Sequence, residues 1–129
     1  DKRILPAIAK AIPYKIIFVL TFGDEAQVWM EVSGAFYNTD WFTLDGFTLR
    51  FEGRNLDVVY ENIARNIAGG RLDVSGDISE AVDRDKQRRK LERDIAALEK
   101  KVLREKQFNR QIELNSELKR LRAELEGLG

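Results

Sequence analysis

The amino-acid sequence predicts an α+β protein: a small antiparallel sheet packed on helices (residues 1–74), followed by a C-terminal antiparallel helical hairpin, or coiled coil (residues 77–127). Three observations predict this class. Apolar and alternating runs typical of strands fill residues 15–52, and apolar residues at helical spacing follow over 56–67. In the last third of the chain, eight apolar residues form pairs equidistant from Phe108, which predicts two helices folded back on each other.

The sheet domain is expected to open with a helix and two strands. Apolar residues at helical spacing predict a helix from Ile4 to Ile12, which Pro13 ends. The uncharged run within KIIFVLTF (15–22) predicts a strand buried on both faces. After a turn at 23–25, the alternation of AQVWMEV predicts a second, antiparallel strand with one apolar face. That face consists of Ala26, Val28, Met30 and Val32.

Further strands and a helix complete this domain. The segment 35–44 predicts a third strand, and 47–52 predicts a short fourth piece at an edge. Asn55 is a typical helix cap, and Gly69–Gly70 is a typical helix end, so a helix is expected between them. Its apolar face consists of Leu56, Val59, Tyr60, Ile63 and Ile67. A linker at 71–76 then leads to the arm.

The arm is expected to begin with a long helix from Asp77 or Ser79 to about Lys106. Its first apolar residues have no counterpart in the hairpin and are expected to pack on the sheet domain. They are Ile78, Ala81 and Val82. The coiled-coil seam itself consists of Leu91, Ile95, Leu98, Val102, Leu114, Leu118, Leu121 and Leu125.

A single straight helix fits the seam less well, because its two apolar stripes would point about 140° apart. However, the turn near Phe108 contains neither Gly nor Pro, and Asn109 is the residue there that most readily accepts positive φ. A coiled coil formed by one straight helix from each of two chains therefore stays open as an alternative. A homodimer that forms through the arm is also left open.

The composition excludes several kinds of chemistry. The chain of 129 residues has no Cys and no His, which excludes disulfides, thiolate zinc sites, cysteine nucleophiles and His-based triads. An enzyme would have to use carboxylates, Lys, Tyr or an oxygen-bound metal such as magnesium. We expect no metal site, no cofactor and no catalytic residues. The 22 basic and 22 acidic residues balance, and the longest apolar run is too short to span a bilayer. With no signal peptide at its start, the chain is expected in the cytoplasm.

One pair of acids leaves a nuclease open as a hypothesis. Asp24 and Glu31 flank the predicted hairpin, an arrangement similar to metal-dependent nuclease sites. The lysine that usually follows the acid by two residues is replaced by Ser33. The alternative is that both acids are simply solvated.

Aromatic and apolar residues supply candidate partner contacts. Trp29, Tyr37 and Trp41 lie in the most aromatic part of the sheet domain, where they either anchor a partner or fill the core. For Trp41 and Phe42, we favour a place in the core. On the arm, Leu103 and Ile112 lie outside the mirror pairing and are candidate partner contacts.

The root of the arm carries a basic run. Between Arg84 and Arg110 there are eleven Lys and Arg against five Asp and Glu. Exposed cations on a helix can contact phosphates, although interleaved acids make a solvated coiled-coil flank the simpler interpretation. The candidate nucleic-acid contacts are Arg84, Arg88, Arg89, Lys90 and Arg93.

Several stretches together resemble a known bacterial and archaeal family, the domain of unknown function 4391. They are IPYKIIFVLTF, TDWF, GRNLDVVYENIARNIAG, AVDRDKQRRKLERDIAALEKK and EKQFNRQIELNSELKRL. The resemblance implies that this chain corresponds to the C-terminal part of a longer protein. The family has no established activity. The resemblance does imply that the gene lies beside genes of DNA methyltransferases and helicases, in restriction and phage-defence clusters.

The expected function is a non-catalytic interaction module, an adaptor in a DNA restriction or phage-defence complex. The expected partner is a protein, a helicase or methyltransferase. Nucleic-acid binding through the basic root of the arm and a metal-dependent nuclease are the alternatives. No membrane association is expected.

Overall fold

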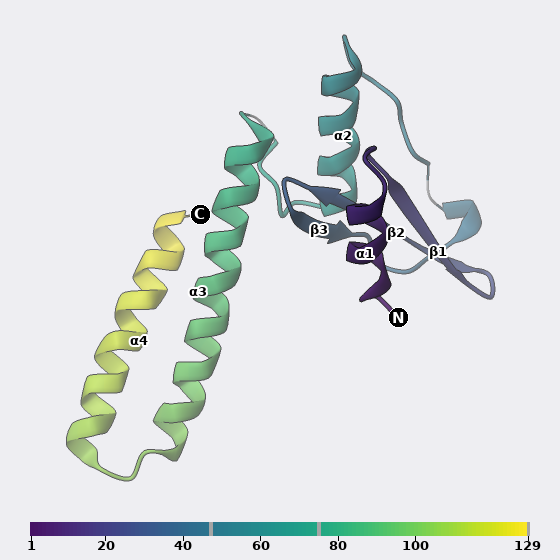
Figure 1. Cartoon of the computed structure of the whole chain (residues 1–129). Helices are drawn as coiled ribbons and strands as arrows, with labels where there is room; N and C mark the ends of the chain where they lie inside the picture. Colours follow the sequence, from purple (N-terminus) through teal and green to yellow (C-terminus); the bar gives the residue numbers. More distant parts are fainter. Residues whose placement is uncertain (47, 75, 129) are drawn as a thin grey trace. The chain divides into compact units, whose positions relative to one another are not determined.

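The computed structural model describes residues 1–46, 48–74 and 76–128 (Figure 1). The chain divides into two compact units, Asp1–Val82 and Asp83–Gly129. The first unit is an antiparallel sheet with helices, and the second is a pair of helices packed against each other. The predicted α+β class with a C-terminal helical hairpin is therefore confirmed.

The sheet has four strands: β1 (Ile17–Phe22), β2 (Glu25–Val32), β3 (Ala35–Asn38) and β4 (Phe42–Thr43). All pairings are antiparallel. β1 occupies one edge of β2, with Ile17 opposite Met30, whereas β3 and β4 both pair along the other edge. Ser33 and Gly34 join β2 to β3 and have positive φ angles of 48° and 77°, as a tight hairpin turn requires.

The predicted third strand is divided into β3 and β4 by the side chain of Thr39. Its Oγ1 accepts a hydrogen bond from the backbone N–H of Val28 at 3.1 Å, so a side chain supplies an acceptor to the neighbouring strand at this point. Residues 48–52, the described part of the predicted fourth strand, are not part of the sheet. Phe47, the first residue of that prediction, lies outside the described residues.

The core of the first unit lies on one face of β2, as its alternation predicts. Ala26, Val28, Met30 and Val32 are all buried. Val28, Met30 and Val32 pack with one side of α2 (Leu56–Ala68) and with the start of α3 (Ile78–Arg104). The residues contributed by these helices include Ile63, Ala64, Ile67, Ala68, Ile78, Ala81 and Val82. The expected packing of Ile78, Ala81 and Val82 on the sheet domain is confirmed.

The opposite face of the sheet faces α1 (Ile4–Ala11) (Figure 1). Leu5 of α1 is buried, and the ammonium of Lys2 lies 5.1 Å from the centre of the Trp29 ring. The sheet therefore lies between α1 on one side and α2 on the other.

The prediction that the first strand is buried on both faces is wrong. Val19 and Phe22 are exposed, although Val19 lies opposite the buried Val28. Within the described residues β1 pairs only with β2, so it is an edge strand. An uncharged run indicates a strand, but it does not tell an edge position from a central one.

The helix ends follow the predicted capping residues. Asn55 Oδ1 accepts a hydrogen bond from the N–H of Val58 at 3.0 Å, and Gly69 ends α2 with a φ of 59°. Asp77 Oδ1 accepts from the N–H of Ser79 at 3.0 Å, so α3 begins directly after Asp77. Leu56 is exposed at the start of α2 and does not join its buried face.

The second unit is a hairpin of α3 and α4 (Phe108–Leu128), which run in opposite directions (Figure 1). The turn occupies residues 105–107, slightly before the predicted position at Phe108. Within the described residues, Ser33 is the one non-glycine residue with positive φ, so Asn109 does not make the turn in the way expected. No described helix is long and apolar enough to cross a membrane.

Candidate functional site

The seam of the arm holds α3 and α4 together. Leu91, Ile95 and Leu118 are buried, and Leu118 is only 5 % exposed. The remaining predicted seam residues are half-buried: Leu98, Val102, Leu114, Leu121 and Leu125. Leu91 and Leu121 line one shallow hollow between the helices together with Leu128, which the mirror pairing about Phe108 had left out. The arm is thus a self-contained element whose apolar stripe is turned inward.

The side chain of Glu105 organises the turn of the arm. Its Oε1 accepts hydrogen bonds from the backbone N–H groups of Lys106 and Gln107, both at 3.0 Å. Its backbone carbonyl accepts from the side-chain amide of Gln111 at 2.6 Å, and its Oε2 lies 3.7 Å from Arg110 Nε. A carboxylate therefore satisfies N–H groups that a tight turn leaves without backbone partners, without Gly or Pro.

The tip of the arm exposes apolar side chains. Leu103 is 86 % exposed and Ile112 is 50 % exposed, so both predicted partner contacts are accessible. Phe108, the first residue of α4, is 73 % exposed and joins them. Phe108 was expected only at the centre of the mirror pairs, and its exposure was not predicted from the sequence.

The basic root of the arm is partly occupied by internal ion pairs. Asp85 is buried, and its carboxylate lies 2.9 Å from Arg89 Nε and 3.6 Å from Arg88 Nη1. Arg84, Arg88 and Arg89 are half-buried, whereas Lys90 and Arg93 are exposed. Arg89 was a candidate nucleic-acid contact, but it is half-buried and its guanidinium lies against Asp85. Three of the five predicted nucleic-acid contacts are therefore only partly accessible.

The aromatic residues of the sheet have three different environments. Tyr37 is 1 % exposed, so of its two predicted places, partner contact or core, it takes the core. Trp29 is half-buried, and its Nε1–H donates to Gln27 Oε1 at 2.8 Å. Trp41 is exposed, which contradicts its expected place in the core, whereas Phe42 packs against the core. Of the three candidates, Trp41 is the one with an exposed side chain.

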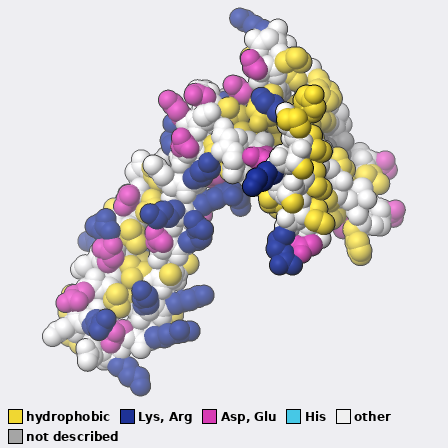
Figure 2. Space-filling model, viewed as in Figure 1, with side chains coloured by type: hydrophobic (Ala, Val, Ile, Leu, Met, Phe, Trp, Pro, Cys, Tyr) yellow, Lys and Arg dark blue, Asp and Glu magenta, His cyan; other side chains and the backbone are white. Residues whose placement is uncertain are grey.

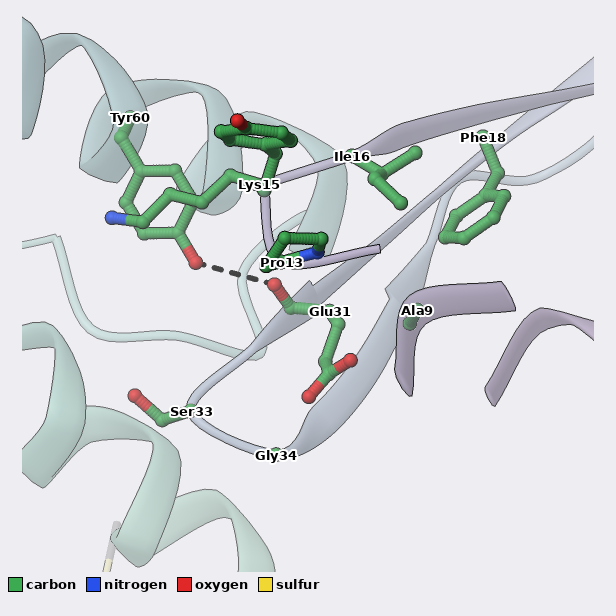
Figure 3. Close-up of a pocket in the computed structure, with 10 residues that line it drawn as sticks. Ala9, Pro13, Lys15, Ile16, Phe18, Glu31, Ser33, Gly34 and Tyr60 are labelled. Atoms are coloured by element: carbon green, nitrogen blue, oxygen red, sulfur yellow. Dashed lines mark hydrogen bonds between the residues drawn. The ribbon is translucent and has the colours of Figure 1, made fainter. Parts of the chain in front are cut away.

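A shallow pocket lies on the first unit, lined by residues from α1, β1, β2 and α2 (Figure 3). The Lys15 ammonium lies 3.6 Å from the centre of the Tyr60 ring. The Tyr60 hydroxyl donates a hydrogen bond to the backbone carbonyl of Glu31 at 3.2 Å. No sequence pattern links Lys15, Glu31 and Tyr60, because only the fold brings them together.

The chemistry available in this pocket is limited. Burial raises the pKa of Tyr60 above its ordinary value of 10.0, and the nearby negative charge of Glu31 adds to this effect. Tyr60 thus keeps its proton at neutral pH and is not a general base there. The pocket presents one cation and one carboxylate, but Lys15 already lies against the Tyr60 ring.

The acids of the nuclease hypothesis lie at opposite ends of β2. Asp24 precedes the strand and Glu31 is near its end, so the backbone separates them by about 23 Å at roughly 3.3 Å per residue. In the described part of the chain, no three His, Cys, Asp or Glu residues lie close enough to hold a metal ion together. The structure does not bring this predicted pair into one site.

These features define the class of protein: a small α+β domain followed by a closed helical hairpin with an exposed tip. The family model named Domain of unknown function (DUF4391) matches residues 1–125, so this chain belongs to that family. The chain matches no curated protein and no solved structure.

Proposed function

We propose that this chain is a non-catalytic interaction module whose helical hairpin docks another protein. The observation that carries this proposal is that the arm, Asp83–Gly129, is a compact unit of its own. Its seam is turned inward, and burying each Leu, Ile or Val contributes roughly 1.5–3 kcal/mol as an upper estimate. The apolar stripes of α3 and α4 are therefore used within the arm, which leaves its outer side chains for a partner.

The chemistry of the chain supports binding rather than catalysis. Without Cys or His, an enzyme would depend on carboxylates, Lys or Tyr. Among these groups, Asp24 and Glu31 lie far apart along β2 and Tyr60 holds its proton more tightly than usual. Asp85, the buried carboxylate of the arm, forms ion pairs with Arg88 and Arg89, and these pairs have a structural role and not a catalytic one.

The partner that we propose is a helicase or methyltransferase of a DNA restriction or phage-defence complex. This choice rests on the gene neighbourhood that the family resemblance implies, which is an association and not a contact. In such a complex the module would act as a cytoplasmic adaptor, with the arm extending the surface available for docking.

A pull-down of the tagged full chain from its own host, with and without nuclease treatment, tests the proposal. Bound proteins are identified by mass spectrometry. We expect at least one protein, a helicase or methyltransferase in particular, to stay bound after nuclease. Partners that all disappear with nuclease would contradict the proposal and favour nucleic-acid binding, with Lys90 and Arg93 as the exposed cations to replace first.

A further inference from the structure

The tip of the arm combines three large apolar side chains that are exposed. Leu103 is 86 %, Phe108 73 % and Ile112 50 % exposed, although each is a residue type that ordinarily lies inside a protein. Leu103 is in the last turn of α3, and Phe108 and Ile112 are in the first two turns of α4. All three are therefore at the same end of the hairpin, next to the turn at 105–107.

Helix geometry places the three on one side of the hairpin. At about 100° per residue, Leu103 lies about 110° beyond the mean direction of the α3 seam. Counted in the same sense, Phe108 lies about 110° beyond the mean direction of the α4 seam. The two helices are antiparallel and their seams face each other, so equal rotations away from the two seams place Leu103 and Phe108 on the same side of the hairpin. Ile112 lies one turn after Phe108 in α4. We call Leu103, Phe108 and Ile112 the tip patch.

The tip also carries a strong positive charge. From Lys100 to Arg110 there are five cations and one carboxylate, Glu105. Figure 2 shows Lys and Arg side chains gathered around this end of the arm. The cations of this stretch are Lys100, Lys101, Arg104, Lys106 and Arg110. A partner of the tip patch must therefore approach through a positive field, which favours negatively charged surfaces.

We propose that the tip patch docks into an apolar socket rimmed by Asp and Glu side chains on a partner protein. This inference rests on the proposed function and adds the docking site and the chemistry of the partner. Burial of exposed aliphatic and aromatic side chains in a protein pocket contributes favourably to the free energy of binding. The anchor residues of an interface are typically apolar and central, and polar residues surround them. Carboxylates on the rim would complement the cations of the tip.

Two other occupants fit these observations less well. A nucleic acid would satisfy the cations, but its phosphates offer nothing to the aliphatic side chains of Leu103 and Ile112. A second copy of this chain, joined tip to tip, would bring two positive ends together, which like-charge repulsion opposes. A protein with an acidic rim satisfies both the apolar and the charged residues of the tip.

Site-directed photo-crosslinking of the full chain in its host tests this proposal. Phe108→p-benzoylphenylalanine places the probe in the tip patch, and Glu113→p-benzoylphenylalanine is the control, about 140° around α4 from Phe108. Glu113 is also exposed. We expect a discrete, nuclease-resistant adduct from position 108 and about tenfold less of it from position 113. The cross-linked peptide should carry a net excess of Asp and Glu.

Two further variants test the two halves of the recognition. Leu103→Gln with Ile112→Gln removes apolar contacts while keeping good helix formers, and Arg104→Gln with Lys106→Gln removes charge. Each pair should lower the yield of the position-108 adduct about threefold or more. Leu56→Gln in α2, at a residue that is 85 % exposed in the first unit, should leave the yield unchanged.

The contradicting outcomes separate this inference from the proposed function. An adduct of equal yield from position 113, or a partner captured by the chain without any adduct at 108, would overturn the tip patch and leave the interaction module standing. An adduct lost with nuclease, one of twice the mass of this chain, or a cross-linked peptide without excess acid would also overturn it. Absence of any bound protein, cross-linked or not, would overturn both proposals.

Discussion

At the scale of single residues, Glu105 holds the arm closed at its turn. Glu105→Ala removes the acceptor of two backbone N–H groups, and we expect it to lower the free energy of unfolding by about 1 kcal/mol, as loss of a helix cap does. Urea unfolding followed by circular dichroism at 222 nm measures this change. The exposed Glu113→Ala is the control, with an expected effect within about 0.5 kcal/mol. Equal effects at both positions would contradict the role of Glu105.

Tyr60 makes the first unit sensitive to alkaline pH. Its pKa is raised by burial and then by the charge of Glu31, so folding favours the protonated phenol. The stability that Tyr60 contributes is complete below pH 10.0, its ordinary pKa, and is lost as the pH rises through the raised value. The Lys15 ammonium lies 3.6 Å from the centre of its ring, and the negative charge of Glu31 opposes ionisation of its hydroxyl.

The Tyr60→Phe variant tests this shift by tyrosinate absorbance at 295 nm. The component of the titration that disappears in the variant should have its midpoint above 10.0. The variant should also lose about 1 kcal/mol of stability at neutral pH, because the hydrogen bond to the Glu31 carbonyl is gone. A missing component with a midpoint at or below 10.0 would show that Tyr60 is not shielded as described.

At the scale of elements, the two helices of the arm depend on their seam. Leu118→Ala should lower the free energy of unfolding by about 2–3 kcal/mol, because Leu118 is the least exposed residue of the seam. Leu103→Ala changes the same residue type where it is almost fully exposed, and we expect less than about 0.5 kcal/mol. Urea unfolding of both variants provides the comparison. A similar loss in both would mean that the seam does not hold the arm.

The helices and strands were largely predictable because local chemistry determines them. Asn55, Gly69 and Asp77 set helix ends by short-range hydrogen bonds and backbone conformation, and these appear directly in the sequence. The edge position of β1 was not predictable, because exposure of Val19 depends on which strands are neighbours. The position of the turn was missed because Glu105 replaces the usual turn residues with a side-chain acceptor.

The candidate surface was only partly predictable from the sequence. Leu103 and Ile112 were identified because they break the helical periodicity of the seam, and both are exposed. The place of Tyr37 was left open, because an aromatic residue on a strand fits the core and the surface equally well until the face is known. The inward position of Arg89 depends on the burial of Asp85, and periodicity alone gives no sign of it.

At the scale of the whole molecule, the two compact units can be followed by different probes. Both tryptophans, Trp29 and Trp41, belong to the first unit. Most helical residues belong to α3 and α4, which have 27 and 21 residues against 8 and 13 in α1 and α2. Leu118→Ala should therefore shift the unfolding transition at 222 nm to lower urea while the tryptophan emission transition moves much less. Equal shifts would mean that the chain unfolds as one cooperative unit.

The central claim is that the folded arm is the part of the chain that partners bind. The most direct test compares the proteins retained by the full chain and by two double variants, using quantitative mass spectrometry. Leu98→Asp with Leu118→Asp opens the seam, whereas Ala97→Asp with Ala123→Asp adds the same charges to exposed positions of the same helices. We predict that the seam variant loses about tenfold or more of the bound partner while the control retains it. Equal retention by all three would contradict the claim and place the binding surface on the sheet domain.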